Sequence, residues 1–277
     1  MPVAHVNGID LYYEVHGGGE PLLWVGGLGA SVREIPHLVD AYAQHYAFIA
    51  YDGRGCGRSG KPAEDYTIAG LADDAAALLD LLGVPSAFVY GSSMGGMVAQ
   101  ELALNHPQKV RALVLGCTTA GAVRGVRAGA ETVRKMVESQ SLSGDAALEA
   151  GWELGYSAAY IRAHRDELLA RARFAAEIAA PRDAYLRQVI AAAKHDTYDR
   201  LEYIMCPTLI VHGSEDAMIP VGNAHLLKRG IPHAELAILQ GAGHGYSLEA
   251  QAEADAIVLG FLRRHGEVTE GAADAAR

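Results

Sequence analysis

The sequence predicts an α/β protein with a mostly parallel, eight-stranded sheet, helices on both sheet faces and a helical insertion near the sheet's carboxyl edge. Three observations support this class. Short apolar runs alternate with segments of helical periodicity along most of the chain. The runs are almost continuously apolar, which is typical of parallel strands buried on both faces. Between Gly121 and about Arg200 no strand-like run occurs, and four helical patterns follow one another instead.

The chain opens with two strand-like segments, residues 3–6 and 11–15, which are joined through Asn7-Gly8. This dipeptide is typical of a tight hairpin turn, so the segments add an antiparallel edge to the sheet. The remaining strands are expected at residues 22–25, 46–51, 87–90, 110–115, 208–212 and 234–239.

Helices are expected between these strands. The pattern at residues 67–82 is the clearest, because Thr67 is a good N-cap, apolar residues recur at helical spacing and Gly83 follows the last of them. The other helices of the sheet region are expected at residues 36–44, 97–104, 221–229 and 248–264.

The segment without strands is too long for a loop. Its helices are expected at residues 131–140, 145–154, 158–179 and 182–194. We therefore expect a core domain made of residues 1–119 and 201–265 and a helical cap, or lid, at residues 120–200. The cap would lie over the carboxyl edge, where such sheets bind ligands. Residues 266–277 are polar and alanine-rich and are expected to form a disordered tail.

The composition limits the classes of partner. Hydrophobic residues make up 50% of the 277 residues and charged residues 20%, which is ordinary for an enzyme. The formal net charge of −10 argues against nucleic acid and anionic membranes as partners. No apolar stretch reaches membrane-spanning length, and no signal-peptide pattern is visible. We expect a cytoplasmic protein that binds a small molecule, and homo-oligomer formation stays open.

The three cysteines are Cys56, Cys117 and Cys206, and two of them lie in apolar, strand-like runs. Their odd number and their surroundings favour buried free thiols in a reducing compartment over a disulfide framework or a metal site. No cluster of metal-ligating residues is visible in the sequence. We therefore expect neither a metal nor an organic cofactor.

Residues 90–96 contain the pattern Gly-x-Ser-x-Gly, with Ser93 at its centre. The pattern is short, and a chain with 32 glycines can contain it by chance. Here it lies between an apolar strand and a helical pattern, which is the context of a nucleophile on a sharp strand-to-helix turn. Gly91 and Gly95 leave room for the reversal of the chain. The context therefore favours Ser93 as a nucleophile.

A serine nucleophile needs a general base, and the base needs an acid that fixes its tautomer. His244 follows the last expected strand in a loop of small residues, and Asp216 follows the strand before it. Glu215 is the alternative acid. The order Ser, Asp, His is the one expected when the serine lies on a strand-to-helix turn. His212 falls within a strand and is interpreted as structural.

An oxyanion site requires two converging backbone N–H groups. One is expected from Met94, the residue after the nucleophile, and the other from Leu28 in the glycine-rich loop after the third strand. Gly27 would let the backbone approach a substrate closely, although the same glycines also suit a tight turn.

Several residues are candidates for contacts with the substrate. The insertion carries aromatic residues that could line a pocket. For any one of them, the alternative that it packs the insertion onto the core is supported at least equally well. The candidates are Gly27, Trp152, Tyr156, Tyr160 and Tyr246, with Phe174 and Tyr185 as further aromatic residues.

Taken together, these blocks resemble the α/β-hydrolase superfamily over nearly the whole chain. The matching blocks are Gly27-Leu28-Gly29, Asp52-x-Arg54-Gly55-x-Gly57-x-Ser59, Gly91-Ser92-Ser93-Met94-Gly95-Gly96, Gly213-x-x-Asp216-x-x-x-Pro220 and Gly243-His244. The segments around the oxyanion loop and the serine look most like the branch of esterases and lactonases similar to 3-oxoadipate enol-lactonase. The resemblance implies Ser93 as nucleophile, His244 as base and Asp216 as acid, with Leu28 and Met94 as oxyanion donors.

One position departs from the family pattern. The family usually has His-Gly before the oxyanion residue, whereas this chain has Gly26 at the histidine position. A side chain that normally braces the loop is missing, so we expect a different loop geometry or a different bracing residue. The nucleophile is serine and not aspartate, which disfavours haloalkane dehalogenase and epoxide hydrolase chemistry.

The expected function is that of a serine hydrolase that cleaves a small-molecule carboxylic ester or lactone through an acyl-enzyme. Two alternatives stay open on the same scaffold. One is hydrolysis of a carbon–carbon bond, or cofactor-free perhydrolysis, by the same three residues. The other is a ligand receptor with slow turnover. The pocket formed by the insertion decides between them.

Overall fold

The computed structural model describes residues 2–139 and 142–266, and in these residues eight strands form one sheet in the order β1-β2-β4-β3-β5-β6-β7-β8. The two pairs β1–β2 and β2–β4 are antiparallel, and every other pair is parallel. The predicted mostly parallel sheet with a hairpin at its edge is therefore confirmed. The strands are β1 (Val3–Val6), β2 (Ile9–His16), β3 (Pro21–Val25), β4 (Ala47–Tyr51), β5 (Ala87–Ser92), β6 (Val110–Gly116), β7 (Thr208–Gly213) and β8 (Glu235–Leu239).

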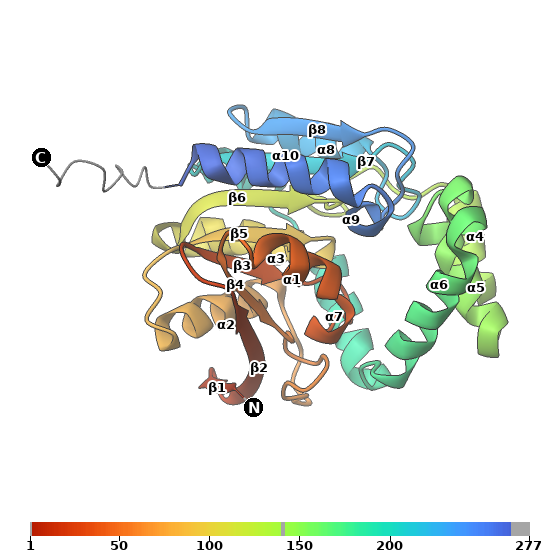
Figure 1. Cartoon of the computed structure of the whole chain (residues 1–277), viewed down its shortest axis with the longest axis horizontal. Coiled ribbons are helices and arrows are strands. Elements are labelled where there is room, and N and C mark those ends of the chain that lie inside the picture. The colour runs from red at the N-terminus through yellow and green to blue at the C-terminus, as the bar shows by residue number, and fades with distance from the viewer. Residues whose placement is uncertain (1, 140–141, 267–277) are drawn as a thin grey trace, which may run out of the picture.

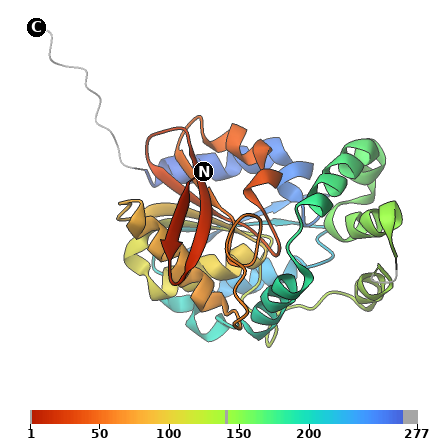
Figure 2. The ribbon, with the colours of Figure 1, turned by 90° about the horizontal axis from the view of Figure 1, so that it is seen from below.

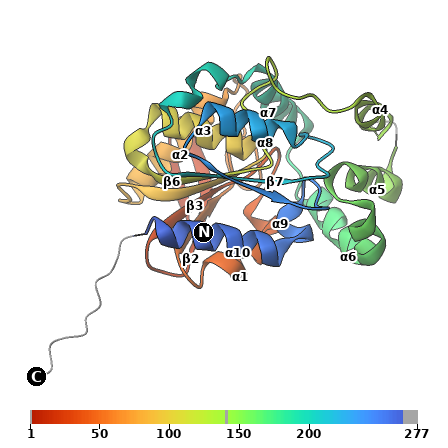
Figure 3. The ribbon, with the colours of Figure 1, turned by 90° about the horizontal axis from the view of Figure 1, so that it is seen from above.

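Helices cover both faces of this sheet (Figures 1 and 3). The central strands contribute side chains to two hydrophobic cores, because successive side chains of a strand point to opposite faces. In β5, Val89 packs into one core, whereas Phe88 and Tyr90 pack into the other. The first face carries α2 (Ile68–Leu81), α3 (Met94–Asn105) and α8 (Gly222–Gly230), and the second carries α1 (Pro36–Tyr42), α9 (Tyr246–Glu249) and α10 (Gln251–Arg264). None of the helices described is both long and apolar enough to span a bilayer.

Two helix starts show how far the local sequence predicts the boundaries of the helices. Thr67 caps α2 by accepting a hydrogen bond from the Gly70 N–H at 3.0 Å, as the sequence predicts. The prediction of a single closing helix at residues 248–264 is wrong at its start, because the structure has two helices there instead of one. Ala250 lies between α9 and α10 with φ −120° and ψ 37°, outside the helical region, and separates them.

Between β6 and β7 the chain forms four helices, which we call the helical insertion: α4 (Ala130–Ser139), α5 (Gly144–Gly155), α6 (Ala158–Glu177) and α7 (Arg182–Lys194). In Figures 1 and 2, α4, α5 and α6 lie beside the core near the carboxyl ends of the strands, and α7 leads back to the core. The division into a core domain and a cap at residues 120–200 stays a prediction. Gln140, the expected end of the first of these helices, and residues 267–277 of the expected tail lie outside the described residues.

The first turn of α3 lies very close to the ends of β3 and β5. A Cβ atom on Gly95 would lie 2.0 Å from the Val25 carbonyl oxygen and 2.6 Å from that of Gly26. A Cβ atom on Gly91 would lie 2.3 Å from the Gly95 carbonyl oxygen. These contacts are shorter than any van der Waals contact, so glycine is required at both positions for the helix to begin at this place.

The close approach predicts the effect of one added methyl group. We expect Gly95→Ala to lower the free energy of unfolding by about 3 kcal/mol, because the new Cβ would displace backbone atoms that cannot rotate away. Gly53→Ala is the matched control, since no atom of the described residues would lie within 4 Å of a Cβ added there. Chemical denaturation of both variants measures the difference. Equal stability of the two variants would contradict the close packing of α3 on β3.

Candidate active site

Ser93 lies on the turn between β5 and α3 with φ 56° and ψ −122°. Residues other than glycine rarely adopt a positive φ, so this conformation must be held by its surroundings. The Ser93 N–H donates to the Gly116 carbonyl at 2.9 Å, and the Thr118 hydroxyl donates to the Ser93 carbonyl at 2.7 Å. The end of β6 therefore fixes the backbone of Ser93 from both sides and leaves its side chain partly exposed.

His244 links Ser93 to an acidic residue. Its Nε2 lies 3.0 Å from the Ser93 Oγ, and its Nδ1 lies 2.8 Å from the Asp216 Oδ2. With Asp216 ionised, the Nδ1 proton is donated to the carboxylate, which leaves the lone pair on Nε2 to accept the hydroxyl proton of Ser93. The structure thus brings together the three side chains that the sequence analysis selected.

Asp216 is buried and accepts several hydrogen bonds. Its Oδ1 accepts from the N–H groups of Met218 at 2.9 Å and Ile219 at 2.8 Å, and the His212 Nε2 lies 3.2 Å from its Oδ2. Burial raises the pKa of Asp216, but the hydrogen bonds from His212, His244 and the Ile219 N–H outweigh it and lower the pKa to about 2. The carboxyl group is therefore ionised near neutral pH.

Glu215, the alternative acid, and His212, the neighbouring histidine, have positions that do not fit a role as the acid or the base. Glu215 is exposed, and its backbone N–H donates to the Ala242 carbonyl at 2.9 Å, so only Asp216 faces His244. His212 is fully buried, and its Nε2 donates to the Ile219 carbonyl at 2.7 Å. His212 thus holds the loop that carries Asp216.

The protonation of His244 depends on its neighbours. Burial lowers the pKa of His244, whereas Cys117 and the Asp216 carboxylate raise it, and together they hold this pKa well above the ordinary value for histidine. A base of this kind is strong enough to accept a hydroxyl proton once the solution pH exceeds its own pKa.

The expected oxyanion donors lie beside Ser93. An added Cβ on Gly27 would lie 3.3 Å from the Ser93 Cβ and 3.8 Å from its Oγ, so the glycine-rich loop lies next to the serine, about one carbon atom away. Met94 is the first residue of α3, where backbone N–H groups have no partner within the helix. Within the described residues, neither the Leu28 N–H nor the Met94 N–H has a hydrogen-bond partner. Both groups are therefore available to a ligand.

A residue that the sequence analysis missed braces the glycine-rich loop, in which Gly26 replaces the usual histidine. The Gln188 Oε1 accepts from the Gly29 N–H at 2.9 Å, and its Nε2 donates to the Arg54 carbonyl at 2.8 Å and to the Cys56 Sγ at 2.9 Å. Gln188 belongs to α7 and is almost fully buried. The helical insertion thus supplies the bracing side chain that the loop itself lacks.

The helical insertion also holds the loop of His244. The Glu249 carboxylate accepts from the Gly243 N–H at 2.8 Å and from the Ser157 N–H at 3.2 Å. On the other side of the histidine, the Gly245 N–H donates to the Gly155 carbonyl at 2.7 Å. Both neighbours of His244 are therefore hydrogen-bonded at the junction between the core and the α5–α6 turn.

The aromatic candidates divide between a cavity and the core. Trp152 and Tyr156 line a cavity of about 510 Å³ between the insertion and the core, and Phe174 lines it as well. Tyr160 stacks on Tyr156, with ring centroids 5.5 Å apart, and does not line this cavity. Tyr246 is a poor candidate for substrate contact, because it is 1% exposed and its hydroxyl lies 2.8 Å from the Tyr90 hydroxyl inside the core.

Comparisons with known proteins agree with this fold. Residues 20–251 match the family model described as alpha/beta hydrolase fold. The putative carbamate hydrolase RutD of Azorhizobium caulinodans is 33% identical over 98% of this chain and 100% of its own. The structure of the enol-lactonase from Burkholderia xenovorans LB400 has a TM-score of 0.82 at 26% identity, covering 95% of this chain and 100% of its own. Est816, described as an N-acyl homoserine lactone degrading enzyme, has a TM-score of 0.81 at 30% identity, covering 94% and 100%.

The ionisation of His244 predicts a pH dependence for any reaction that uses it as a base. We expect kcat/KM to rise with pH through a midpoint above about 6.5, because protonated imidazole cannot accept a proton and the pKa of His244 is raised. Asp216→Asn should lower kcat by roughly three orders of magnitude and shift the midpoint down, since the anion that raises this pKa is removed. Glu215→Gln is the control and should behave as the wild type. If kcat fell as far in Glu215→Gln as in Asp216→Asn, Glu215 would be the acid in place of Asp216.

The hydrogen bonds of Glu249 predict a positioning role. We expect Glu249→Ala to lower kcat roughly tenfold with little change in KM, because the Gly243 N–H next to the histidine loses its partner. Glu253→Ala, an exposed position on α10, is the control. Steady-state kinetics at several pH values provide the readout. If Glu249→Ala kept full kcat, the carboxylate would have no part in holding the histidine loop.

Proposed function

The chain belongs to the α/β-hydrolase family, and from this premise we propose that it is a serine hydrolase that cleaves a small-molecule carboxylic ester or lactone. The observation that supports the proposal best is the unbroken series of hydrogen bonds from the Ser93 Oγ through His244 to Asp216. The two unpartnered N–H groups of Leu28 and Met94 beside the same serine, among the residues described, add to it. A serine, a base, an acid and two free donors are what acyl transfer requires.

In the proposed acylation step, the Ser93 Oγ attacks the substrate carbonyl carbon while its proton passes to the His244 Nε2. The carbonyl oxygen becomes negatively charged and is stabilised by the N–H groups of Leu28 and Met94. The imidazolium that forms is stabilised by the Asp216 carboxylate. When the tetrahedral intermediate collapses, the bond to the leaving alkoxide breaks, and His244 returns the proton to it.

In the proposed deacylation step, water takes the place of the alcohol. His244 removes a proton from water, the hydroxide attacks the acyl carbon, and the same two N–H groups hold the oxyanion. Collapse of this intermediate breaks the bond to the Ser93 Oγ, which recovers its proton from His244. The net reaction adds one water to one ester bond and yields an acid and an alcohol. For a lactone, both products are one hydroxy acid.

The choice of esters and lactones is supported by the relatives. One structural neighbour is described as an enol-lactonase and another as an enzyme that degrades an N-acyl homoserine lactone. Both cover more than nine-tenths of this chain. In a lactone the alcohol stays attached to the acyl group, so a lactone and an open ester present the same carbonyl to Ser93.

Carbamate hydrolysis is a second candidate, because a relative whose match covers 98% of this chain carries the name putative carbamate hydrolase. A carbamate carbonyl is flanked by nitrogen and oxygen, and it would meet Ser93 and the two N–H groups in the same way. The same steps apply, with the amine or alcohol as the leaving group. Rates on matched ester, lactone and carbamate substrates decide between the two candidates.

We also propose that the helical insertion acts as a cap that covers the substrate. Its contacts with the oxyanion loop through Gln188 and with the histidine loop through Gly155 support this role. The three free cysteines fit a reducing compartment, and we propose a cytoplasmic location on this basis.

The proposed nucleophile predicts a sharp contrast between two adjacent serines. We expect Ser93→Ala to lower the hydrolysis of a short p-nitrophenyl ester by roughly 10⁴-fold or more, since the attacking oxygen is removed. Ser92→Ala is the control, because the Ser92 Oγ has the Cys117 Sγ, 3.4 Å away, as its partner and no atom of Ser93, His244 or Asp216. Labelling with a fluorophosphonate, followed by peptide mapping, should modify Ser93 in the wild type. Undiminished turnover in Ser93→Ala would defeat the proposal.

A further inference from the structure

The loop that carries His244 has to reach across two strands of the sheet. β5 leads to Ser93 and β8 leads to His244, and β6 and β7 lie between these two strands. Since neighbouring strands lie about 4.8 Å apart, the ends of β5 and β8 are separated by roughly 14 Å. The distance of 3.0 Å between the Ser93 Oγ and the His244 Nε2 therefore depends on the contacts that hold this loop over β5 and β6.

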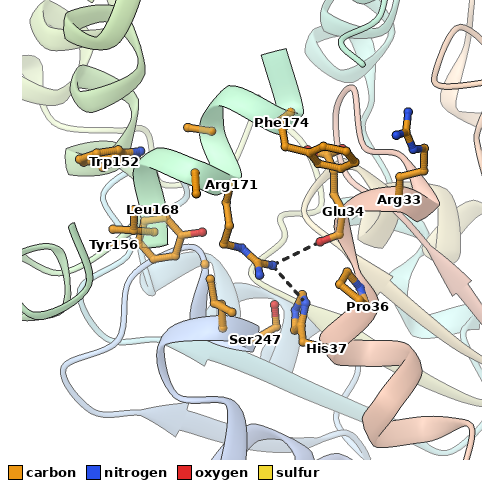
Figure 4. Close-up of a pocket in the computed structure, with 15 residues that line it drawn as sticks. Arg33, Glu34, Pro36, His37, Trp152, Tyr156, Leu168, Arg171, Phe174 and Ser247 are labelled. Atoms are coloured by element: carbon orange, nitrogen blue, oxygen red, sulfur yellow. Dashed lines mark hydrogen bonds between the residues drawn. The ribbon is translucent and has the colours of Figure 1, made fainter. Parts of the chain in front are cut away.

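Tyr246, two residues after His244, anchors this loop in the core. Ser247, the next residue, lines the cavity between the insertion and the core (Figure 4), whereas the Tyr246 side chain is only 1% exposed. The Tyr246 hydroxyl lies 2.8 Å from the hydroxyl of Tyr90, which belongs to β5 and precedes Ser93 by three residues. We call these two residues the tyrosine pair. Their hydrogen bond joins the loop of the proposed base directly to the strand of the proposed nucleophile.

The tyrosine pair packs against the residue that holds the Ser93 backbone. The Gly116 carbonyl, at the end of β6, accepts from the Ser93 N–H at 2.9 Å. A Cβ atom added to Gly116 would lie 2.2 Å from the Tyr246 hydroxyl oxygen and 3.3 Å from the Tyr90 Cε2. A side chain at this position would therefore displace the pair. The end of β6 thus supports both the turn of Ser93 and the anchor of the histidine loop.

Burial determines the chemical state of the tyrosine pair. It raises the pKa of both hydroxyls well above the ordinary value for tyrosine, so both keep their protons near neutral pH. One hydroxyl then donates to the other. Removal of one hydroxyl leaves its partner buried and unpaired, which destabilises the protein, whereas removal of both leaves no polar group behind. The contribution of the hydrogen bond can therefore be separated from that of the two rings.

We propose that Tyr90 and Tyr246 are positioning residues of the proposed active site, and that their hydrogen bond sets the distance between the Ser93 Oγ and the His244 Nε2. Both tyrosine side chains are only 1% exposed, so they act through the backbones of β5 and of the histidine loop and not by contact with a substrate. The expected effect on turnover rests on the proposed function. The expected effect on the distance rests on the geometry of the core alone.

The proposal is tested with Tyr246→Phe, Tyr90→Phe and the double variant, which remove hydroxyls and keep the rings. We expect each single variant to lower kcat for a short p-nitrophenyl ester roughly tenfold with little change in KM, because a small misplacement of reacting groups slows the reaction strongly. The double variant should lose no more kcat than either single variant, since the same hydrogen bond is absent in all three. Its stability in chemical denaturation should nevertheless recover, because no unpaired hydroxyl stays buried. Recovery of kcat together with stability, or losses of kcat that multiply in the double variant, would overturn the proposal.

Tyr42→Phe is the matched control. The Tyr42 hydroxyl lies in the same core, but it donates to the Asp255 Oδ1 at 2.9 Å and so joins α1 to α10 instead of β5 to the histidine loop. We expect this variant to lose stability and to keep kcat, measured at a temperature at which all variants are folded. A loss of kcat in Tyr42→Phe as large as that in Tyr246→Phe would count against a specific role of the tyrosine pair and overturn the proposal.

Crystal structures of the variants separate this proposal from the proposed function. In Tyr246→Phe, we expect the distance between the Ser93 Oγ and the His244 Nε2 to exceed about 3.5 Å, beyond the reach of a hydrogen bond. In Tyr42→Phe it should stay at 3.0 Å. These distances test the positioning role even if the wild type hydrolyses no ester. An unchanged distance in Tyr246→Phe, or full kcat in this variant, overturns the proposal.

Discussion

The first turn of α3 lies so close to the carboxyl ends of β3 and β5 that no side chain fits between them. Gly91 and Gly95 meet this constraint, since an added Cβ on either would lie within 2.3 Å of a backbone oxygen. The same approach places Ser93 at the tip of the turn with a positive φ, where its hydroxyl reaches His244. It also leaves the N–H of Met94 without a partner in the helix. The positions of the proposed nucleophile and of one proposed oxyanion donor thus depend on this close approach of backbone segments.

The proposed active site is supported from two parts of the chain. The sheet carries the three side chains of the proposed triad at the ends of its strands, where parallel strands bring loops to a common edge. The helical insertion then holds two loops at this edge, the oxyanion loop and the histidine loop. Gln188 of α7 braces the oxyanion loop through Gly29, and the α5–α6 turn holds the histidine loop through Gly155 and Glu249. The insertion therefore contributes to the geometry of the reacting groups as well as to the cavity.

The fold and the meeting of Ser93, His244 and Asp216 could be predicted because their determinants are local in the sequence. Buried strands have continuous apolar runs, and the glycines around Ser93 and the small residues around His244 mark sharp turns at strand ends. Asp216 and Glu215 could be ranked but not separated with certainty, because which of them is buried depends on the turn after β7.

The supporting residues could not be predicted, because their roles arise from contacts between segments far apart in the chain. Gln188 carries a weak signal: it is a polar residue on the face of α7 that also carries Ala184 and Ala191, and all three are buried. The burial of Tyr246 could not be predicted for the same reason. The sequence places this residue near His244 but does not show that its ring points into the core.

The hydrogen bonds at the α5–α6 turn have a consequence for how this fold can diversify. If the insertion were replaced by one whose α5–α6 turn takes another path, the Gly245 N–H would lose the Gly155 carbonyl and Glu249 would lose the Ser157 N–H. A chimera that retains residues 155–157 and exchanges the helices around them keeps these partners. New specificity is therefore more accessible by varying α4 and the outer parts of α5 and α6 than by wholesale grafting.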